Sequence, residues 1–302
     1  MARIFLHIGT HKTGTTSIQY YLNYRKDELL AQGILAPGAG KTSDSEYSGN
    51  HRLAWSVDFR KGETTTECWD HLDEIMKTVA HEKVVLSSEA FCLLNLENVG
   101  RVKELLKGHE VIIIIYFRNY KAFLRARYAQ VIRDRKEIRS FPGYVSSSED
   151  WTDYDKILRN WGEHFGYDHL IVRVYDEVIS KGNLISDFCR IIGFIPPEND
   201  RYFQLQRNTS PDEQTIKIMR LVNICKTRLP FLIKDQTFRD LKEAYFNNVA
   251  KYTRQKWFLK FFVRNHSYSK SSEKLITQLN KNKNQQILKK MIGQKSMDFL
   301  EK

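Results

Sequence analysis

The feature that most constrains the fold is an uninterrupted apolar run at residues 111–117, Val-Ile-Ile-Ile-Ile-Tyr-Phe. A strand with one face in water alternates apolar and polar residues, whereas this run is apolar on both faces. Shorter strand-like runs occur at residues 3–8, 83–88 and 169–175. We therefore expect an α/β fold with a central, mainly parallel sheet that is covered by helices on both sides.

Helical patterns alternate with these strands, as a wound α/β fold requires. They lie around residues 100–107, 120–135, 153–165 and 183–193. Residues 212–302 contain no strand pattern and are expected to be helical. The sequence thus predicts one three-layer, P-loop-like domain over residues 1–302, with a core at about 1–225 and a basic helical C-terminal region at about 226–302.

Composition narrows the class of protein. The 302 residues are 41% hydrophobic and 28% charged, which is enough apolar material for a folded core. The sequence has neither an apolar run long enough to cross a membrane nor a secretory signal pattern. The cysteines share no metal-binding spacing and suggest reduced thiols, so we expect a cytoplasmic protein. They are Cys68, Cys92, Cys189 and Cys225.

The net charge of +12 is concentrated near the C-terminus. Residues 216–302 carry 20 basic and 6 acidic side chains, whereas the rest of the chain is close to neutral. Such a region attracts acidic polysaccharide or the anionic inner face of a membrane, although a solvated basic surface is an equal alternative. Residues 251–264 place aromatic and basic side chains at helical spacing, which fits a membrane-surface helix or a helix packed on the domain. No nucleic-acid-binding motif accompanies the charge.

The segment from Gly9 to Thr16, Gly-Thr-His-Lys-Thr-Gly-Thr-Thr, lies between a predicted strand and a predicted helix. Its glycines have the spacing of a Walker A loop, but the lysine is inside the loop, at Lys12, and not after the second glycine. Backbone N–H groups at a helix N-terminus still bind oxyanions in such a loop. The segment therefore predicts a phosphate-type binding site.

The ends of the other strands lack the aspartate with which P-loop NTPases help to hold Mg²⁺. One strand ends at Glu89 and another at Arg118. An arginine at this edge suits an anion, and a carboxylate suits a general base. Glu89 has a structural alternative as a helix cap, and His51, after a polar loop, is a second candidate base or an ordinary surface histidine.

Several motifs in order resemble those of sulfotransferases that use 3′-phosphoadenosine 5′-phosphosulfate (PAPS), and in particular their bacterial, carbohydrate-sulfotransferase-like branch. The resemblance covers roughly residues 3–225. It is carried by the loop at residues 6–19, Ser87-Ser88-Glu89, Tyr116-Phe-Arg-Asn119, residues 161–176, Asp187-Phe188 with Gly193, and Asn208-Thr-Ser210.

The resemblance implies a role for each matching position. Lys12 would contact the sulfuryl group and the 5′-phosphate, and Glu89 would be the base. Arg118 would bind the 3′-phosphate, and Tyr175 would contact adenine. The implied nucleotide contacts also include His11 through its backbone and the run Thr13, Gly14, Thr15, Thr16 and Ser17, with Arg207 and Asn208 as late contacts or a plain surface turn.

Two positions depart from the pattern of the family. Ala126 stands where the 3′-phosphate motif has a serine, and Ser17 stands where many members have an aromatic residue. The expected function is transfer of a sulfuryl group from PAPS, without a metal, to a hydroxyl of a carbohydrate or cell-envelope glycan, leaving the desulfated nucleotide PAP. The alternatives are a P-loop small-molecule kinase and a non-catalytic nucleotide-binding relative.

Overall fold

The computed structural model describes residues 1–42, 48–59, 62–63, 65–135, 137–148, 152–198, 200, 202, 213–228, 274–277 and 285–301. The chain divides into two compact units. The first combines residues 1–119, 153–207 and 284–302, and the second combines residues 120–152 and 208–283. The expectation of one domain over the whole chain stays a prediction, and each unit is described by itself.

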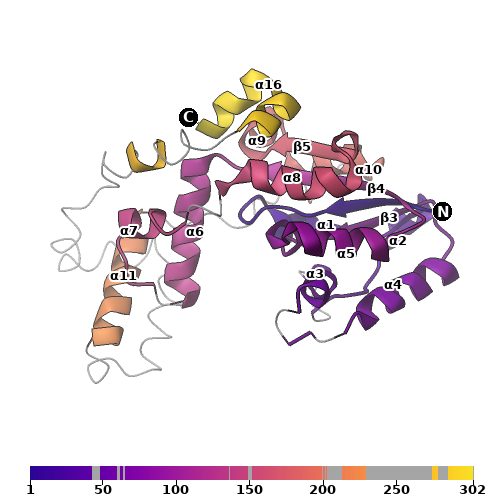
Figure 1. Ribbon diagram of the computed structural model, residues 1–302, viewed down its shortest axis with the longest axis horizontal. Coiled ribbons are helices and arrows are strands. Elements are labelled where there is room, and N and C mark those ends of the chain that lie inside the picture. Colours follow the sequence, from indigo (N-terminus) through magenta and orange to yellow (C-terminus); the bar gives the residue numbers. More distant parts are fainter. Residues whose placement is uncertain are drawn as a thin grey trace. The chain divides into compact units, whose positions relative to one another are not determined.

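The first unit is built on a five-stranded sheet in which every strand pair is parallel (Figure 1). The strand order is β2-β3-β1-β4-β5. The strands are β1 (Arg3–His7), β2 (Ile34–Leu35), β3 (Lys83–Ser87), β4 (Glu110–Phe117) and β5 (Leu170–Val174). The predicted α/β class and its four strands are confirmed, whereas the two-residue edge strand β2 was not anticipated.

The described helices of this unit are α1 (Thr15–Tyr24), α2 (Lys26–Ala31), α3 (His51–Val57), α4 (Glu67–Thr78), α5 (Leu96–Leu105), α8 (Tyr154–Phe165), α9 (Tyr175–Lys181), α10 (Leu184–Ile192) and α16 (Gln286–Glu301). Six of these helices lie between strands in the chain, and α9, α10 and α16 follow the last strand. Short 3₁₀ turns occur at Phe91–Leu93 and Tyr167–His169. No helix in the described ranges is long and apolar enough to cross a membrane.

The apolar run of β4 explains why both faces of the sheet are covered. Ile114 and Tyr116 join a buried cluster with side chains of α1, α2 and α10 on one face. Phe117 points to the opposite face and stacks on Tyr154 of α8, with ring centroids 4.1 Å apart. Successive residues of a strand point to opposite faces, so a run that is apolar at every position serves both layers.

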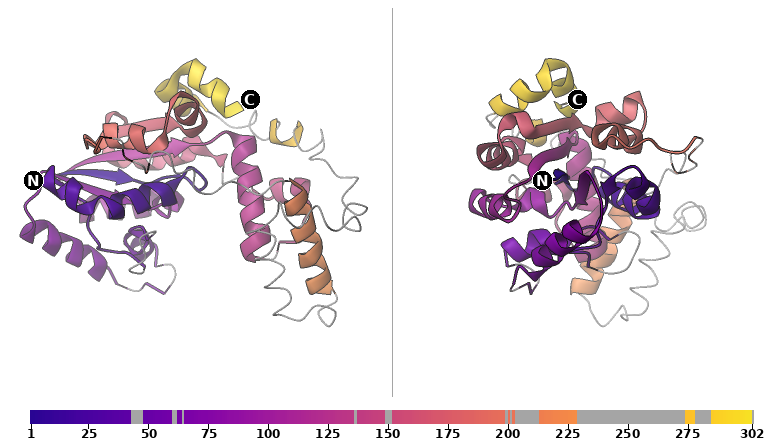
Figure 2. Two further views of the ribbon diagram at one scale, coloured as in Figure 1. Left: turned by 180° about the vertical axis from the view of Figure 1, so that it is seen from behind. Right: turned by 90° about the vertical axis from the view of Figure 1, so that its right-hand side faces the viewer.

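The last described helix, α16, belongs to the same unit. It lies against α8, β5 and α9 (yellow in Figure 2). Its first turn is fixed by Asp155 of α8, whose carboxylate accepts the backbone N–H groups of Ile287 and Leu288 at 3.2 and 2.9 Å. An acidic group at a helix N-terminus satisfies donors that have no partner within the helix.

The second unit contains α6 (Tyr120–Arg135), α7 (Phe141–Val145) and α11 (Glu213–Arg228). The side chain of Asn223 on α11 donates to the carbonyl oxygens of Ile132 and Glu137, which ties α11 to the end of α6. The predicted aromatic and basic helix at residues 251–264 lies outside the described residues.

Candidate functional site

The loop between β1 and α1 has a backbone that its sequence makes possible. Gly9 and Gly14 have φ values of 54° and 77°, a region that glycine enters without strain. Lys12 has φ 65°, which is uncommon for a residue with a side chain. A Cβ atom on Gly14 would lie 2.4 Å from Cδ2 of Leu184, so this glycine also allows close packing of α10.

The loop is held by its own threonines. Thr13 donates its hydroxyl to the carbonyl of Thr10 at 2.7 Å, and Thr10 donates its hydroxyl to the carbonyl of Tyr116 at 2.8 Å. The Thr13 hydroxyl therefore donates within the loop, and a contact of Thr13 with the nucleotide, through its backbone N–H, stays a prediction. The side chains of Thr16 and Ser17, which are less buried, and the first backbone N–H groups of α1 are better placed to bind an anion.

Arg118 follows β4 and contacts both the loop and Tyr175, the first residue of α9. Its Nη1 donates to the carbonyl of Lys12 at 2.8 Å, and its guanidinium carbon lies 5.3 Å from the ring centroid of Tyr175. Its Nε is buried and has no hydrogen-bond partner among the described residues. A buried cationic donor without a partner is costly, and an anionic ligand would satisfy it.

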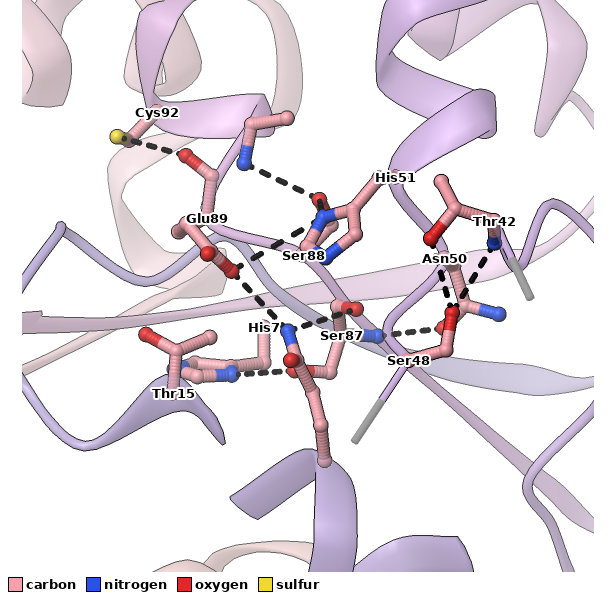
Figure 3. A network of polar contacts seen from close by, with 12 residues as sticks. His7, Thr15, Thr42, Ser48, Asn50, His51, Ser87, Ser88, Glu89 and Cys92 are labelled. Atoms are coloured by element: carbon pink, nitrogen blue, oxygen red, sulfur yellow. Dashed lines mark hydrogen bonds and ion pairs between the residues drawn. The ribbon is translucent and has the colours of Figure 1, made fainter. Parts of the chain in front are cut away.

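Glu89 lies on the other side of the loop, directly after β3. Its Cβ is 3.4 Å from the position of a Cβ built on Gly9. Its Oε2 accepts a hydrogen bond from the amide of Gln19 at 3.1 Å and lies 4.0 Å from Nδ1 of His51 (Figure 3). The helix-cap alternative does not describe this side chain, because the backbone N–H of Ala90 bonds to the hydroxyl of Ser88.

His51 is the first residue of α3 and is fixed on two sides. Its Nδ1 lies 2.7 Å from Oγ of Ser88 (Figure 3). Its ring stacks on Trp55, with centroids 5.6 Å apart. Both predicted candidates for the base thus converge at the end of β3. Of the two, Glu89 is the one that lies directly beside the loop.

The surroundings of Glu89 act on its pKa in opposite directions. Burial raises the pKa, whereas the positive potential of His51 and His11, hydrogen bonding to its own backbone and the Gln19 amide lower it. The net result is a pKa below the ordinary value for glutamate. The carboxylate is therefore ionised at neutral pH and able to accept a proton.

His7, on β1, is a core residue. It is fully buried, its Nδ1 lies 2.8 Å from the hydroxyl of Ser87, and burial lowers its pKa to about 4. At neutral pH the imidazole is therefore uncharged.

The predicted residues after β1, β3, β4 and β5 meet at one edge of the sheet. Arg207 and Asn208 lie outside the described residues, and Ala126 is a buried residue of α6 in the second unit. The sequence did not indicate Gln19, Gly49 and Asn50 as site residues, because a single glutamine in a helix and a Gly-Asn pair in a polar loop carry no spacing signal. Asn50 is structurally important: its Oδ1 accepts the backbone N–H of Ser87 at 2.9 Å.

A hollow of about 600 Å³ lies in the first unit between β5, α9, α10 and α16, and none of the predicted site residues that the structure describes lines it. Its wall includes Arg173 and Arg190, whose guanidinium groups lie 3.6 and 3.5 Å from the carboxylate of Asp187. Asp187 also accepts a hydrogen bond from the hydroxyl of Tyr116. The hollow is therefore distinct from the edge at which Lys12, Glu89 and Arg118 meet.

Comparison with known proteins gives few matches. No protein-family model matches the chain. An uncharacterized protein of Archaeoglobus fulgidus is 28% identical over 145 residues, which are 46% of this chain and 38% of that protein, so the match spans about two fifths of the relative's length. The crystal structure of a sulfotransferase from Alicyclobacillus acidocaldarius is 17% identical and covers 78% of this chain and 98% of that chain, with a TM-score of 0.45.

Proposed function

We propose that this protein is a PAPS-dependent sulfotransferase that transfers a sulfuryl group to an acceptor hydroxyl. The observation that carries the proposal is the meeting of Glu89, the Lys12 loop and Arg118 at the ends of three adjacent strands, β3, β1 and β4. These are the positions at which the sequence resembles the family. The class of acceptor, a carbohydrate or cell-envelope glycan, rests on that resemblance.

The loop and Arg118 would hold the donor nucleotide. Backbone N–H groups at the start of α1, with the hydroxyls of Thr16 and Ser17, would bind the 5′-phosphate. The free donors of Arg118 would bind the 3′-phosphate, for which the fork of a guanidinium is well suited. Tyr175, whose ring lies beside Arg118, would contact adenine.

The chemical step is an in-line displacement at sulfur. The carboxylate of Glu89 takes the proton of the acceptor hydroxyl as the acceptor oxygen forms a bond to sulfur. The bond between sulfur and the bridging phosphate oxygen breaks, and its electron pair stays on the phosphate of the leaving PAP. Lys12 stabilises the negative charge that develops on that bridging oxygen.

Calorimetric titration with PAP tests the proposal without knowledge of the acceptor. We expect PAP to bind without magnesium and more tightly than ADP, because ADP lacks the 3′-phosphate that Arg118 would contact. Binding of ATP that depends on magnesium, with none of PAP, would instead indicate a kinase. Binding of PAP without any release of PAP from PAPS in the presence of candidate glycans would indicate a non-catalytic relative.

A further inference from the structure

Gln19 is a buried polar residue to which the proposed reaction gives no role. It lies on α1, one turn after the start of the helix, and is 3% exposed. Its Nε2 lies 3.1 Å from Oε2 of Glu89 and 3.5 Å from the carbonyl oxygen of Ser87. A buried amide is costly unless it is hydrogen-bonded, and both of these acceptors lie at the end of β3.

The amide of Gln19 is also enclosed on a third side by Gly49. A Cβ atom on Gly49 would lie 2.4 Å from Nε2 of Gln19 and 2.6 Å from the carbonyl oxygen of Ser87. Gly49 has an ordinary backbone conformation, because its φ is not in the left-handed region. The absence of a side chain at this position therefore serves close packing and leaves the glutamine amide little freedom to turn away.

From this geometry we infer that Gln19 is a positioning residue for Glu89. It holds Oε2 of the carboxylate by a hydrogen bond, so that Oε1 is the oxygen that accepts the proton of the acceptor hydroxyl. The inference rests on the proposed function for the role of Glu89 as base. The hydrogen bond itself exists whether or not PAPS is the donor.

Gln19 also joins the base to the donor loop. Helix α1 begins at Thr15, directly after Gly14, and carries Gln19 one turn later. The segment that would bind the 5′-phosphate and the residue that holds the base are thus parts of one rigid helix. When the donor is bound, its sulfur and the base oxygen would therefore be positioned relative to each other through α1 and the hydrogen bond between Gln19 and Glu89.

The contribution of Gln19 can be separated from that of the charged groups around Glu89. The histidines that face Glu89 are His51 on α3, His11 in the loop and His7 on β1. A histidine side chain is neutral or positively charged depending on its protonation, whereas the amide of Gln19 is uncharged at every pH. A neutral replacement of similar length removes the hydrogen bond and leaves all three histidines in place.

The test is a titration of Glu89 by NMR in protein with ¹³C-labelled glutamate carboxyl groups, its signal assigned with Glu89→Gln. In Gln19→Met we expect a higher pKa of Glu89 than in the unchanged protein, because a donor to the ionised form is lost. The matched control is Gln32→Met. Gln32 is an exposed glutamine that donates to and accepts from the backbone of Ile195, and its replacement should leave the titration of Glu89 unchanged.

A second measurement on the unsubstituted protein does not depend on how a variant folds. The chemical shift of the side-chain amide proton of Gln19 should change with pH, and the midpoint of this change should equal the pKa of Glu89. The change should be lost in Glu89→Gln. An amide proton that does not follow the ionisation of Glu89, or an unchanged Glu89 pKa in folded Gln19→Met, would overturn the inference. Neither readout uses PAPS, so failure of the proposed function appears separately as an absence of PAP binding.

The catalytic consequence is then measured as release of PAP from PAPS. In Gln19→Met the acid limb of the rate should move to higher pH, and the rate on its plateau should fall by about 10-fold to 10²-fold, because the base is misplaced. The affinity for PAP should change little. A plateau rate and an acid limb equal to those of the unchanged protein would also contradict the inference.

Discussion

Lys12 is unusual both in its position between two loop glycines and in its backbone conformation. It is a lysine in a loop bounded by glycines, and its backbone lies in the left-handed region with φ 65°. For a residue with a side chain, such a conformation has a cost that the surrounding structure must offset, and it tends to occur at functional sites. Its carbonyl accepts a hydrogen bond from Arg118, so the backbone of Lys12 is tied to the end of β4.

We expect Lys12→Ala to lower kcat/KM for release of PAP from PAPS by about 10²–10³-fold, because the charge on the bridging oxygen is no longer stabilised. The thermal midpoint of unfolding should change little. Lys26→Ala, at an exposed lysine of α2, is the matched control and should keep full activity. Activity of Lys12→Ala within tenfold of the unchanged protein would remove Lys12 from the mechanism.

Glu89 and His51 are distinguished by two substitutions and one pH profile. Glu89→Gln keeps the size of the side chain but cannot accept the proton, so turnover should fall by about 10²–10⁴-fold with the affinity for PAP nearly unchanged. His51→Ala should lose less, since the ring lies 4.0 Å from the carboxylate and supports it electrostatically.

The pH profile gives an independent readout of the same assignment. The pKa of Glu89 lies below the ordinary value for glutamate. The rate should therefore stay on its plateau until the pH falls to the ordinary pKa of glutamate, and should decline at lower pH as the carboxylate is protonated. Residual activity of Glu89→Gln should lack this limb. A large loss in His51→Ala, with nearly normal turnover in Glu89→Gln, would transfer the role of base to His51.

At the scale of elements, the segment before α3 is hydrogen-bonded to the end of β3 and packs closely against it. The backbone N–H of Asn50 donates to the carbonyl of Ser87 at 2.9 Å, and its side chain donates to the carbonyls of Pro37 and Ala39. Gly49 sits against the same carbonyl of Ser87. The connection therefore places His51 and Glu89 side by side.

Gly49→Ala should disturb this connection. The new Cβ would lie 2.6 Å from a backbone oxygen, which cannot move without the strand, so we expect a loss of about 1–3 kcal/mol in the free energy of unfolding. Gly38→Ala is the control, since a Cβ there meets nothing within 4 Å. Urea unfolding measures the free energy of unfolding of both variants. Equal values would show that the backbone around Gly49 can shift to accommodate a Cβ atom at no cost.

The elements differ in how well the sequence predicted them. The four longer strands are confirmed because each contains a run of mostly apolar residues, which are buried nearly throughout in β1 and β3 and at every second position in β5. The first loop was located by its glycines. Strand β2 has only two residues, too few for any periodicity to appear. Gln19 was missed for a different reason: a glutamine is an ordinary residue of an exposed helix face, and only the fold shows that this one faces β3.

At the scale of the whole molecule, the sequence indicated the fold class and the position of the charge, but not the division of the chain into two compact units. The basic excess in residues 216–302 is a property of the sequence. The two compact units interleave along the chain, because residues 120–152 leave the first unit and residues 153–207 return to it. The apolar patterns that predict the helices and strands do not mark these crossings. The points at which the chain passes from one unit to the other are determined by contacts between residues that are distant in sequence.

The stability of the molecule toward acid should depend on His7. Burial lowers its pKa in the folded protein to about 4, whereas an unfolded chain has the ordinary value of 6.5. The unfolded state therefore takes up a proton first as the pH falls. The stabilising effect of the neutral imidazole is fully present above pH 6.5 and is lost progressively as the pH falls toward 4.

Between pH 7.5 and pH 5.0, His7 should thus account for about 2 kcal/mol of the decrease in the free energy of unfolding. His7→Asn should be less stable at pH 7.5, because the ring packs against Tyr116 and Phe188, but its stability should fall less steeply with acid. His71→Asn, at an exposed position of α4, should keep the slope of the unchanged protein. Urea unfolding at several pH values measures all three. If His7→Asn kept the full slope, protonation of this buried histidine would not be what links stability to pH, and a carboxylate would have to take its place.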